Sequence, residues 1–277
     1  MALSFEILCA TMHQKDFSKI KSMNIHSNVV FANQSDENSY QEMNFEGCVA
    51  KMITTTTRGV GLNRNFALLA SSKDVILFAD DDTFFYDGLE ENVVAAFAKL
   101  PKADVIIFGM DYSQNGQVCE SIKVPTGKLP FYKSLKFGTA FLAIRRSAYL
   151  KANLIFSQLF GGGCVYLHGE DSDFIINCYR KGLRIYTYDY VLGVTSKDSS
   201  TWFSGYGEKY FFDTGALAKF AFGKLAKPYM LYMTFRVRKE TEVNSIKRMR
   251  LLCAGHKSYD NLVSFDEYKR KVSANHW

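Results

Sequence analysis

The feature that most constrains the fold is an apolar run that ends in three carboxylates. Residues 75–78 (Val-Ile-Leu-Phe) contain no polar side chain, which is typical of a short strand buried on both faces of a parallel sheet. Asp80, Asp81 and Asp82 begin two residues later, at the end of the strand where open α/β sheets bind ligands. Carboxylates this close repel one another unless a positive charge neutralises them. Because Mg²⁺ and Mn²⁺ prefer oxygen ligands, the pattern indicates a site for a divalent cation and a phosphate group. The alternative is an acidic turn in water.

The composition is that of a globular protein with a sizeable core. Of the 277 residues, 47% are hydrophobic and 15% aromatic, which excludes a disordered chain. The six cysteines are scattered, without a CxxC pair, so we expect reduced thiols in a cytosolic protein. The first residues lack a basic segment followed by an apolar run, and nowhere do 18 apolar residues follow one another. We therefore expect no secretion signal and no transmembrane helix.

Positive charge is concentrated at the C-terminal end. Residues 205–277 hold 14 Lys and Arg against 7 Asp and Glu, whereas the preceding 204 residues hold 20 against 21. This asymmetry predicts an anionic partner for the C-terminal segment, either a membrane surface or a nucleic acid. In that segment the aromatic residues alternate with aliphatic residues in helix-like runs, which favours lipid or protein packing over base stacking.

Strands and helices alternate over the first 110 residues, which predicts a parallel, doubly wound sheet. The strands are expected at residues 5–10, 28–32, 53–57, 75–78 and 104–108. One helix is expected through residues 66–70, opened by the glycine-rich turn 59–65, and another at 88–100. Further strands are expected at 118–124, 137–144 and 184–188.

The basic segment is predicted to be helical. Residues 216–226 and 229–235 carry aromatic and aliphatic side chains beside lysines, and Pro228 is expected to break or kink the helix between them. The basic run 236–239 follows. This pattern fits a helix lying in a membrane interface; a helix packed on the rest of the protein is the alternative.

Three glycine-containing turns precede helices or polar groups. Gly59 and Gly61 open the first predicted helix, where backbone N–H groups can meet phosphate. The run 161–163 of three glycines predicts a mobile or ligand-approaching loop, or a plain turn. After Gly169, Glu170 and Asp171 start another helix, where they suit the positive end of the helix dipole or offer a general base to a ligand.

Four of these motifs, in order, resemble the family 2 glycosyltransferases of the GT-A fold over about residues 3–195. Gly59, Arg64 and Asn65 match a G-x-x-x-x-R-N pattern, and Asp80 and Asp82 match the D-x-D that ends the next strand. Residues 145–147 (Arg-Arg-Ser) and 169–171 (Gly-Glu-Asp) match two later elements.

The resemblance implies a role for each matching residue. Asp82 would bind a divalent metal, Mn²⁺ or Mg²⁺, that bridges the donor diphosphate. Asp80 would contact the ribose or assist the metal, and Asp81 beside it would also bind the donor. Asp171 would be the general base that deprotonates the acceptor hydroxyl, and Glu170 would help to hold the acceptor. The nucleotide pocket would be lined by Thr11, by Asn33 or Asp36, and by Arg64.

The sequence departs from the family pattern at one point. Many relatives have a His after the last core strand as a further metal ligand, but residues 194–203 contain none. Ser196, Lys197 and Asp198 are the groups available to replace it, Lys197 by placing a positive charge near the diphosphate. His168, just before the acidic pair, is expected to be a local hydrogen-bonding residue rather than a ligand.

The resemblance thus predicts an α/β protein with a GT-A fold, a Rossmann-like, mixed, mainly parallel sheet flanked by helices. We expect a catalytic domain at 1–204, with a donor-binding half at about 1–110 and an acceptor half at about 111–204, followed by a basic helical extension at 205–277. The expected enzyme is an inverting glycosyltransferase that uses a UDP-sugar and a saccharide or lipid-linked oligosaccharide, for a capsule or another surface polysaccharide. It would be cytoplasmic and peripheral on the membrane. A non-catalytic scaffold with this fold is the alternative. A haloacid-dehalogenase-like phosphotransferase ranks lower, because Phe84 stands where that family has Thr or Val.

Overall fold

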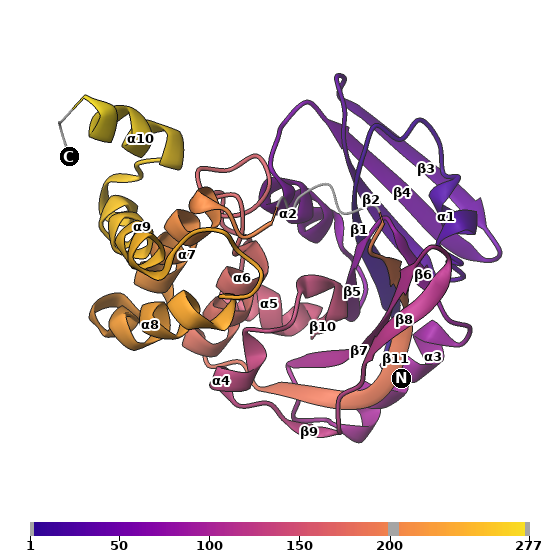
Figure 1. The fold of residues 1–277 in the computed structure, drawn as a ribbon. Helices are drawn as coiled ribbons and strands as arrows, with labels where there is room; N and C mark the ends of the chain where they lie inside the picture. The colour runs from indigo at the N-terminus through magenta and orange to yellow at the C-terminus, as the bar shows by residue number, and fades with distance from the viewer. Residues whose placement is uncertain (1–2, 199–204, 275–277) are drawn as a thin grey trace. The chain divides into compact units, whose positions relative to one another are not determined.

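The structure is a computed structural model that describes residues 3–198 and 205–274 (Figure 1). The chain forms two compact units. The sheet unit comprises residues 1–156 and 174–200, and the helical unit comprises residues 157–173 and 201–277. The helical unit therefore combines an internal segment with the C-terminal part of the chain.

The sheet unit is built on one mixed sheet of 11 strands. The order along the sheet is β3-β4-β2-β1-β5-β10-β7-β11-β6, with β8 paired to β7 and β9 paired to β11. The strands are β1 (Phe5–Met12), β2 (Asn28–Gln34), β3 (Ser39–Phe45), β4 (Cys48–Thr55), β5 (Val75–Asp80), β6 (Thr83–Phe85), β7 (Val105–Gln114), β8 (Gln117–Ile122), β9 (Gly127–Lys128), β10 (Leu142–Arg145) and β11 (Ile185–Ser196).

The first half of this sheet is parallel, as the sequence predicts. β4, β2, β1 and β5 run in the same direction, and Figure 1 shows them side by side. The apolar run 75–78 of β5 lies between β1 and β10 and is at most 1% exposed. β10 is antiparallel to both β5 and β7, and β11 returns parallel to β7. The result is the mixed sheet of a GT-A-like fold, with its parallel strands concentrated around β1; the pairings of β3, β6, β8, β9 and β10 are antiparallel, so the sheet as a whole is less parallel than the sequence predicts.

Helices flank this sheet. They are α1 (Lys19–Ser22), α2 (Val60–Ala70), α3 (Leu89–Lys99), α4 (Phe131–Ser134), α5 (Arg146–Ala152) and α6 (Glu170–Arg180), with a 3₁₀ turn, η1 (Thr139–Phe141). α2 packs on β1 and β2, and α3 packs on β11. α6 begins in the helical unit and ends in the sheet unit, where Phe174 stacks on Phe156 with ring centroids 4.2 Å apart.

Several parts of the sheet differ from the sequence prediction, among them the short strands β6 and β9, which were not expected. β3 was not expected, because its residues are mostly exposed and show no apolar alternation; its pairing with β4 forms it. The strand expected at 137–144 is instead η1 followed by the short β10. Phe137 and Phe141 are both buried, with ring centroids 5.9 Å apart. Residues four positions apart lie on the same face of a strand, so the sequence pattern suggested a strand, although a turn brings the two rings together here.

The helical unit contains four helices and two 3₁₀ turns within its described residues. They are α7 (Glu208–Phe222), η2 (Gly223–Leu225), α8 (Ala226–Arg236), α9 (Ser245–Ser258), η3 (Tyr259–Asn261) and α10 (Phe265–Ser273). α7 lies at its centre and packs on α8 and α9. α7 and α9 approach closely at Gly215 and Gly255, where an added Cβ would lie 2.1 Å from Leu252 O and 1.8 Å from Phe212 O, respectively.

Pro228 does not break a helix, contrary to the sequence prediction. It is the third residue of α8, which runs without interruption from Ala226 to Arg236. The N–H groups of the first helical turn have no intrahelical acceptor, so a proline there costs no hydrogen bond. The interruption lies earlier, at Gly223, whose φ is +55°.

No helix among the described residues is long and apolar enough to cross a membrane.

Candidate functional site

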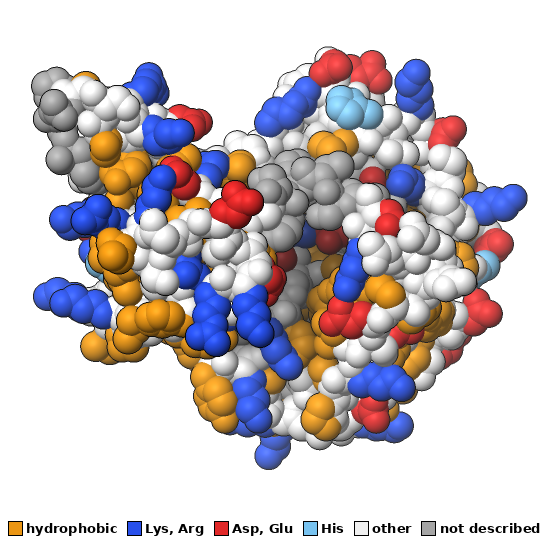
Figure 2. Space-filling model, viewed as in Figure 1, with side chains coloured by type: hydrophobic (Ala, Val, Ile, Leu, Met, Phe, Trp, Pro, Cys, Tyr) orange, Lys and Arg blue, Asp and Glu red, His pale blue; other side chains and the backbone are white. Residues whose placement is uncertain are grey.

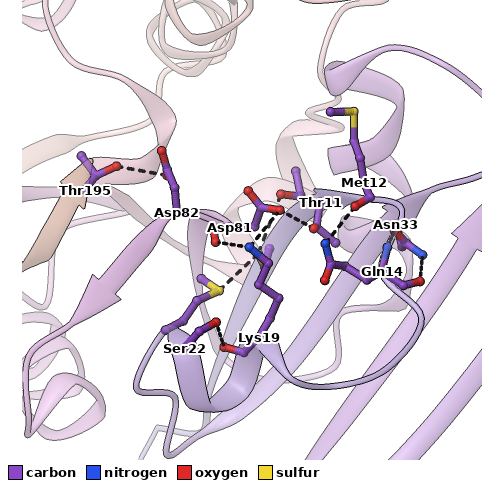
Figure 3. A network of polar contacts seen from close by, with 12 residues as sticks. Thr11, Met12, Gln14, Lys19, Ser22, Asn33, Asp81, Asp82 and Thr195 are labelled. Carbon is purple, nitrogen blue, oxygen red and sulfur yellow. Dashed lines mark hydrogen bonds and ion pairs between the residues drawn. The ribbon is translucent and has the colours of Figure 1, made fainter. Parts of the chain in front are cut away.

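The three aspartates lie at the carboxyl ends of neighbouring parallel strands. Asp80 ends β5 opposite Ala10 of β1, and Thr11 of β1 lies opposite Asn33 of β2. Asp81 and Asp82 form the turn between β5 and β6. The fold therefore gathers polar side chains from separate parts of the sequence at one edge of the sheet (Figure 3).

Asp81 is held by groups from the first strand and the first helix. Thr11 Oγ1 donates a hydrogen bond to Asp81 Oδ2, at 2.5 Å. The Lys19 ammonium donates to the Asp81 carbonyl at 2.9 Å and lies 3.5 Å from the Asp81 carboxylate. Figure 3 shows Lys19 pointing from α1 toward this turn. Sequence reasoning missed Lys19, because a four-residue helix gives no periodic signal.

Asp80 pairs with Arg64 of α2. The Arg64 guanidinium is 2.8 Å from Asp80 Oδ1, and its side chain is 6% exposed against 48% for Asp80. The same guanidinium lies over the Phe156 ring, 5.4 Å from its centroid. The turn before α2 is fixed by Gly59, which has a φ of +113° and donates its N–H to Gln34 Oε1 at 2.9 Å. A residue with a Cβ rarely adopts this backbone conformation, which accounts for glycine at the turn.

Asp82 contacts the last long strand of the sheet. Thr195 of β11 donates a hydrogen bond from Oγ1 to Asp82 Oδ1 at 3.0 Å (Figure 3). Surrounding protein raises the pKa of the Asp82 carboxyl, the negative charge of Asp80 raises it further, and the Thr195 hydroxyl opposes the rise. An ionised Asp82 is thus electrostatically disfavoured in the folded protein, and a nearby cation relieves this.

The three residues proposed to replace the missing histidine have other partners. The Lys197 ammonium pairs with Glu120 at 2.5 Å and lies over the Tyr112 ring. Asp198 Oδ2 accepts the backbone N–H of Asn115 at 2.8 Å, and Ser196 Oγ accepts the N–H of Asp198 at 3.1 Å. The residue of this strand end that contacts Asp82 is Thr195. Residues 199–203 of the stretch considered lie outside the described residues.

The side chains of two other candidate nucleotide-binding residues, Asn33 and Asp36, contact other residues of the protein. The Asn33 amide is fully buried; it donates to Gln14 O and Thr54 Oγ1 and accepts the N–H of Gln14. Asp36, whose carboxylate is 86% exposed, pairs with Arg58 at 2.8 Å. Their roles in a nucleotide pocket stay predictions.

The donor atoms at this edge suit a hard divalent cation. Asp80, Asp81 and Asp82 supply carboxylate oxygens, the ligands that Mg²⁺ and Mn²⁺ prefer, and Asp82 carries an unfavourable charge. Among residues 3–198 and 205–274, however, no three His, Cys, Asp or Glu side chains are grouped as a complete metal site. A cation held here would therefore take its remaining ligands from substrate phosphates and water, as Mg²⁺ commonly does.

Glu170 and Asp171 lie in the first turn of α6, within the helical unit. Both are half-buried. α6 starts with the hydrogen bond that the Asp173 N–H donates to Gly169 O at 2.7 Å. The positive end of the helix dipole favours carboxylates in this turn.

His168 is a local hydrogen-bonding residue, and this prediction is confirmed. Its Nε2 is 3.1 Å from Tyr210 O, and its ring stacks on the Tyr210 ring with centroids 4.7 Å apart.

The three glycines at 161–163 form a turn in which the Cys164 N–H donates to Gly161 O at 3.0 Å, and Gly161 and Gly162 are buried. The plain-turn reading of this loop agrees with that geometry.

Comparison with known proteins supports both the fold and the family. Residues 28–154 match the family model described as glycosyl transferase family 2. The fold is similar to that of S. aureus TarS 1–349, with a TM-score of 0.58, 13% identity, and coverage of 98% of this chain and 79% of that chain. For the same fragment in complex with UDP-GlcNAc, the TM-score is 0.60 at 13% identity, again over 98% of this chain and 79% of that one. A further structure of S. aureus TarS matches with a TM-score of 0.55 at 13% identity, over 98% of this chain and 46% of that chain. No curated protein matches the sequence.

Proposed function

Residues 28–154 belong to glycosyl transferase family 2, and from this premise we propose that the chain moves a sugar from a UDP-linked donor onto a saccharide or a lipid-linked oligosaccharide, with inversion at the anomeric carbon. The observation that carries the proposal is the gathering of Asp80, Asp81 and Asp82 at the carboxyl edge of a GT-A-like sheet, beside Arg64 and Lys19. TarS, which has a similar fold, has been solved with UDP-GlcNAc and with UDP.

The donor half recognises the nucleoside diphosphate through charge. Asp82, with Asp80, would hold a divalent cation, Mn²⁺ or Mg²⁺, which when bound would neutralise the charge that develops on the leaving diphosphate. Arg64 keeps Asp80 in place through their 2.8 Å ion pair. Thr11 and Lys19 do the same for Asp81. Holding these carboxylates before the substrate arrives lowers the reorganisation needed in the transition state.

The acceptor is activated by a carboxylate. Asp171 takes the proton of the attacking acceptor hydroxyl, and Glu170 beside it hydrogen-bonds the acceptor sugar. A base that acts from the face opposite the departing diphosphate gives inversion, because the new bond forms as the old one breaks on the other side.

Removing the Asp82 and Asp171 carboxylates one at a time tests this proposal. We expect Asp82→Ala to lose UDP release from a UDP-sugar together with transfer, and Asp171→Ala to lose transfer while it still binds UDP. Asp189→Ala is the matched control, since Asp189 is exposed on β11 and has no part in the proposed chemistry. Turnover that both Asp82→Ala and Asp171→Ala retain in full contradicts the proposal.

The lipid-linked acceptor implies a membrane surface, and α8 offers a face for it. Leu231, Tyr232 and Phe235 are 52–57% exposed on one side of α8, whereas Met230 and Met233 on the other side are buried. Lys and Arg flank the exposed side, and residues 214–239 contain no Asp or Glu. Figure 2 shows hydrophobic and basic side chains together over α8.

An apolar strip flanked by basic residues suits the headgroup region of an anionic bilayer. We therefore place the protein on the cytoplasmic face of the membrane, as a peripheral enzyme of capsule or other surface-polysaccharide synthesis. Phe211, Phe212 and Ala216 of α7 are fully buried, whereas Leu225, just before α8, is 79% exposed, so the exposed apolar side chains are those of α8 together with Leu225.

Co-sedimentation with vesicles tests the membrane face. Vesicles containing phosphatidylglycerol should bind the protein at low salt, and phosphatidylcholine vesicles should not. Replacing Leu231, Tyr232 and Phe235 together with serine should abolish binding. Leu69→Ser, which removes a side chain that is 80% exposed on α2, should leave it intact. Equal binding by the two variants rules out α8 as the membrane face.

A further inference from the structure

The segment that leads into the acidic pair of α6 is held by one side of α7. Leu167 donates its backbone N–H to Asp213 Oδ2 at 2.9 Å. His168 Nε2 is 3.3 Å from Thr214 Oγ1, one residue further along α7. Only two residues, His168 and Gly169, separate Leu167 from Glu170, so these contacts fix the chain immediately before the proposed base and its neighbour.

Gly169 completes the contact with α7. Its φ is +107°, and a Cβ at this position would lie 3.1 Å from both terminal methyl groups of Leu217. The Gly169 carbonyl accepts the first hydrogen bond of α6, from Asp173. The positions of residues 167–169 therefore determine where the first turn of α6 begins and where its carboxylates lie.

Asp213 is an unusual residue to find inside this unit. Its side chain is 0% exposed, and burial raises the pKa of its carboxyl, although the Lys209 ammonium 3.3 Å away and the Leu167 N–H oppose the rise. Its second oxygen, Oδ1, is buried without a hydrogen-bond partner among the described residues. Burying a carboxylate costs free energy unless its contacts compensate. Because this buried carboxylate is energetically unfavourable and contacts the segment just before α6, we infer that Asp213 has a role other than packing.

We propose that Asp213 is a positioning residue for sugar transfer, which fixes the Leu167–Gly169 segment and thereby the place of Asp171. The inference rests on the proposed role of Asp171 as the base. Asp213 touches neither donor nor acceptor in this scheme. It acts through the backbone of Leu167.

Two substitutions separate the hydrogen bond from the charge. Asp213→Ala removes the acceptor of the Leu167 N–H, whereas Asp213→Asn keeps an acceptor oxygen and loses the ion pair with Lys209. Displacement of a catalytic group by about 1 Å can cost roughly 100-fold in rate. We expect a loss of up to this size in kcat for Asp213→Ala, with unchanged donor KM and UDP affinity. We expect Asp213→Asn to restore most of the kcat. Lys209→Met, the control, should keep the wild-type kcat, although it leaves the Asp213 carboxylate without this ion pair and so lowers stability.

Hydrogen exchange provides a readout that does not depend on activity. The Leu167 amide should exchange faster in Asp213→Ala than in the wild type and remain protected in Asp213→Asn. Wild-type kcat in Asp213→Ala, beside an inactive Asp171→Ala, overturns this inference and leaves the proposed function intact. Wild-type activity of Asp171→Ala removes the proposed base and this inference with it.

A structural role gives a different result. If Asp213→Ala loses UDP affinity and kcat together and Asp213→Asn rescues neither, Asp213 supports the fold alone and the inference is wrong. Should Asp213→Ala fail to fold, Gly169→Ala perturbs the same segment from its other end. It should lower kcat and spare UDP affinity, and an undiminished kcat overturns the inference.

Discussion

Two arginine–aspartate pairs of equal length test whether burial decides their contribution to stability. Arg64–Asp80 and Arg58–Asp36 both have an N–O distance of 2.8 Å. The Arg64 side chain is 6% exposed, whereas the Arg58 side chain is 51% exposed. Arg58 also donates to three backbone carbonyls, of Ser35 and residues 56 and 57. Replacing each arginine by methionine removes the charge and keeps an unbranched apolar side chain.

The expected magnitudes follow from that difference. Removing one partner of a fully buried pair costs about 3–5 kcal/mol, and a hydrogen bond to a charged group contributes about 1.5–3 kcal/mol. Asp80 is half-exposed and regains water, so we expect Arg64→Met to lower the free energy of unfolding by about 2–3 kcal/mol. Water replaces the contacts of the exposed arginine, so Arg58→Met should cost only about 0–1 kcal/mol.

Urea unfolding followed by circular dichroism measures both values, and the slope of the unfolding free energy against urea should be the same in all three proteins. Arg64→Met should also weaken UDP binding, because it leaves Asp80 without its cation beside Asp81 and Asp82. Equal losses of stability in the two variants, or a larger loss in Arg58→Met, would refute the reasoning from burial.

Other substitutions test separate parts of the structure. Gly255→Ala forces a methyl group into Phe212 O and should cost about 1–3 kcal/mol or more by overpacking, seen as a lower melting temperature. Asp82→Asn should stabilise the protein at pH 7, since the folded-state pKa of Asp82 lies above its ordinary 3.8 and ionisation therefore disfavours folding as the pH rises through that interval. The gain in melting temperature should vanish well below pH 3.8, where the carboxyl is protonated in both states; a gain that persists there has another origin. Thr195→Val removes a hydrogen bond that lowers the pKa of Asp82, so Mn²⁺-dependent UDP binding should weaken and its acidic limit should move to higher pH in calorimetry at several pH values. An unchanged limit excludes that coupling.

The donor half of the fold could be predicted because its signals are local. The apolar run of β5 and the aspartates that follow it are consecutive in sequence, and parallel strands bring such ends to one edge. Gly59 and Arg64 belong to one turn and one helix, so their spacing was also readable. The pairing of Arg64 with Asp80 follows once α2 packs on β1 and β2.

Contacts made by irregular or long elements could not be predicted in the same way. β11 was expected to end near residue 188, yet it continues through register shifts to Ser196 and delivers Thr195 to Asp82. Asn33 follows a strand as a ligand-binding group does, but hydropathy does not reveal that its amide is used by Gln14 and Thr54.

In the helical unit, the sequence predicts the helices but not which of their faces are buried. The apolar residues of α7 and α8 predicted helices correctly, but periodicity alone does not separate a face buried against α9 from one left exposed. The close approach of Gly215 and Gly255 decides that, and it joins residues 40 positions apart in sequence. The same holds for Asp213, whose contact with Leu167 spans 46 positions.

The central claim is that the carboxylates after β5 form the site for a nucleoside diphosphate and a divalent cation. Calorimetric titration with UDP, with and without Mn²⁺, on the wild-type protein and on Asp82→Ala tests it most directly. The account predicts binding that requires Mn²⁺ in the wild type and is lost in Asp82→Ala. Equal UDP affinity in the two proteins, or the absence of UDP binding by the wild type under both conditions, would contradict it.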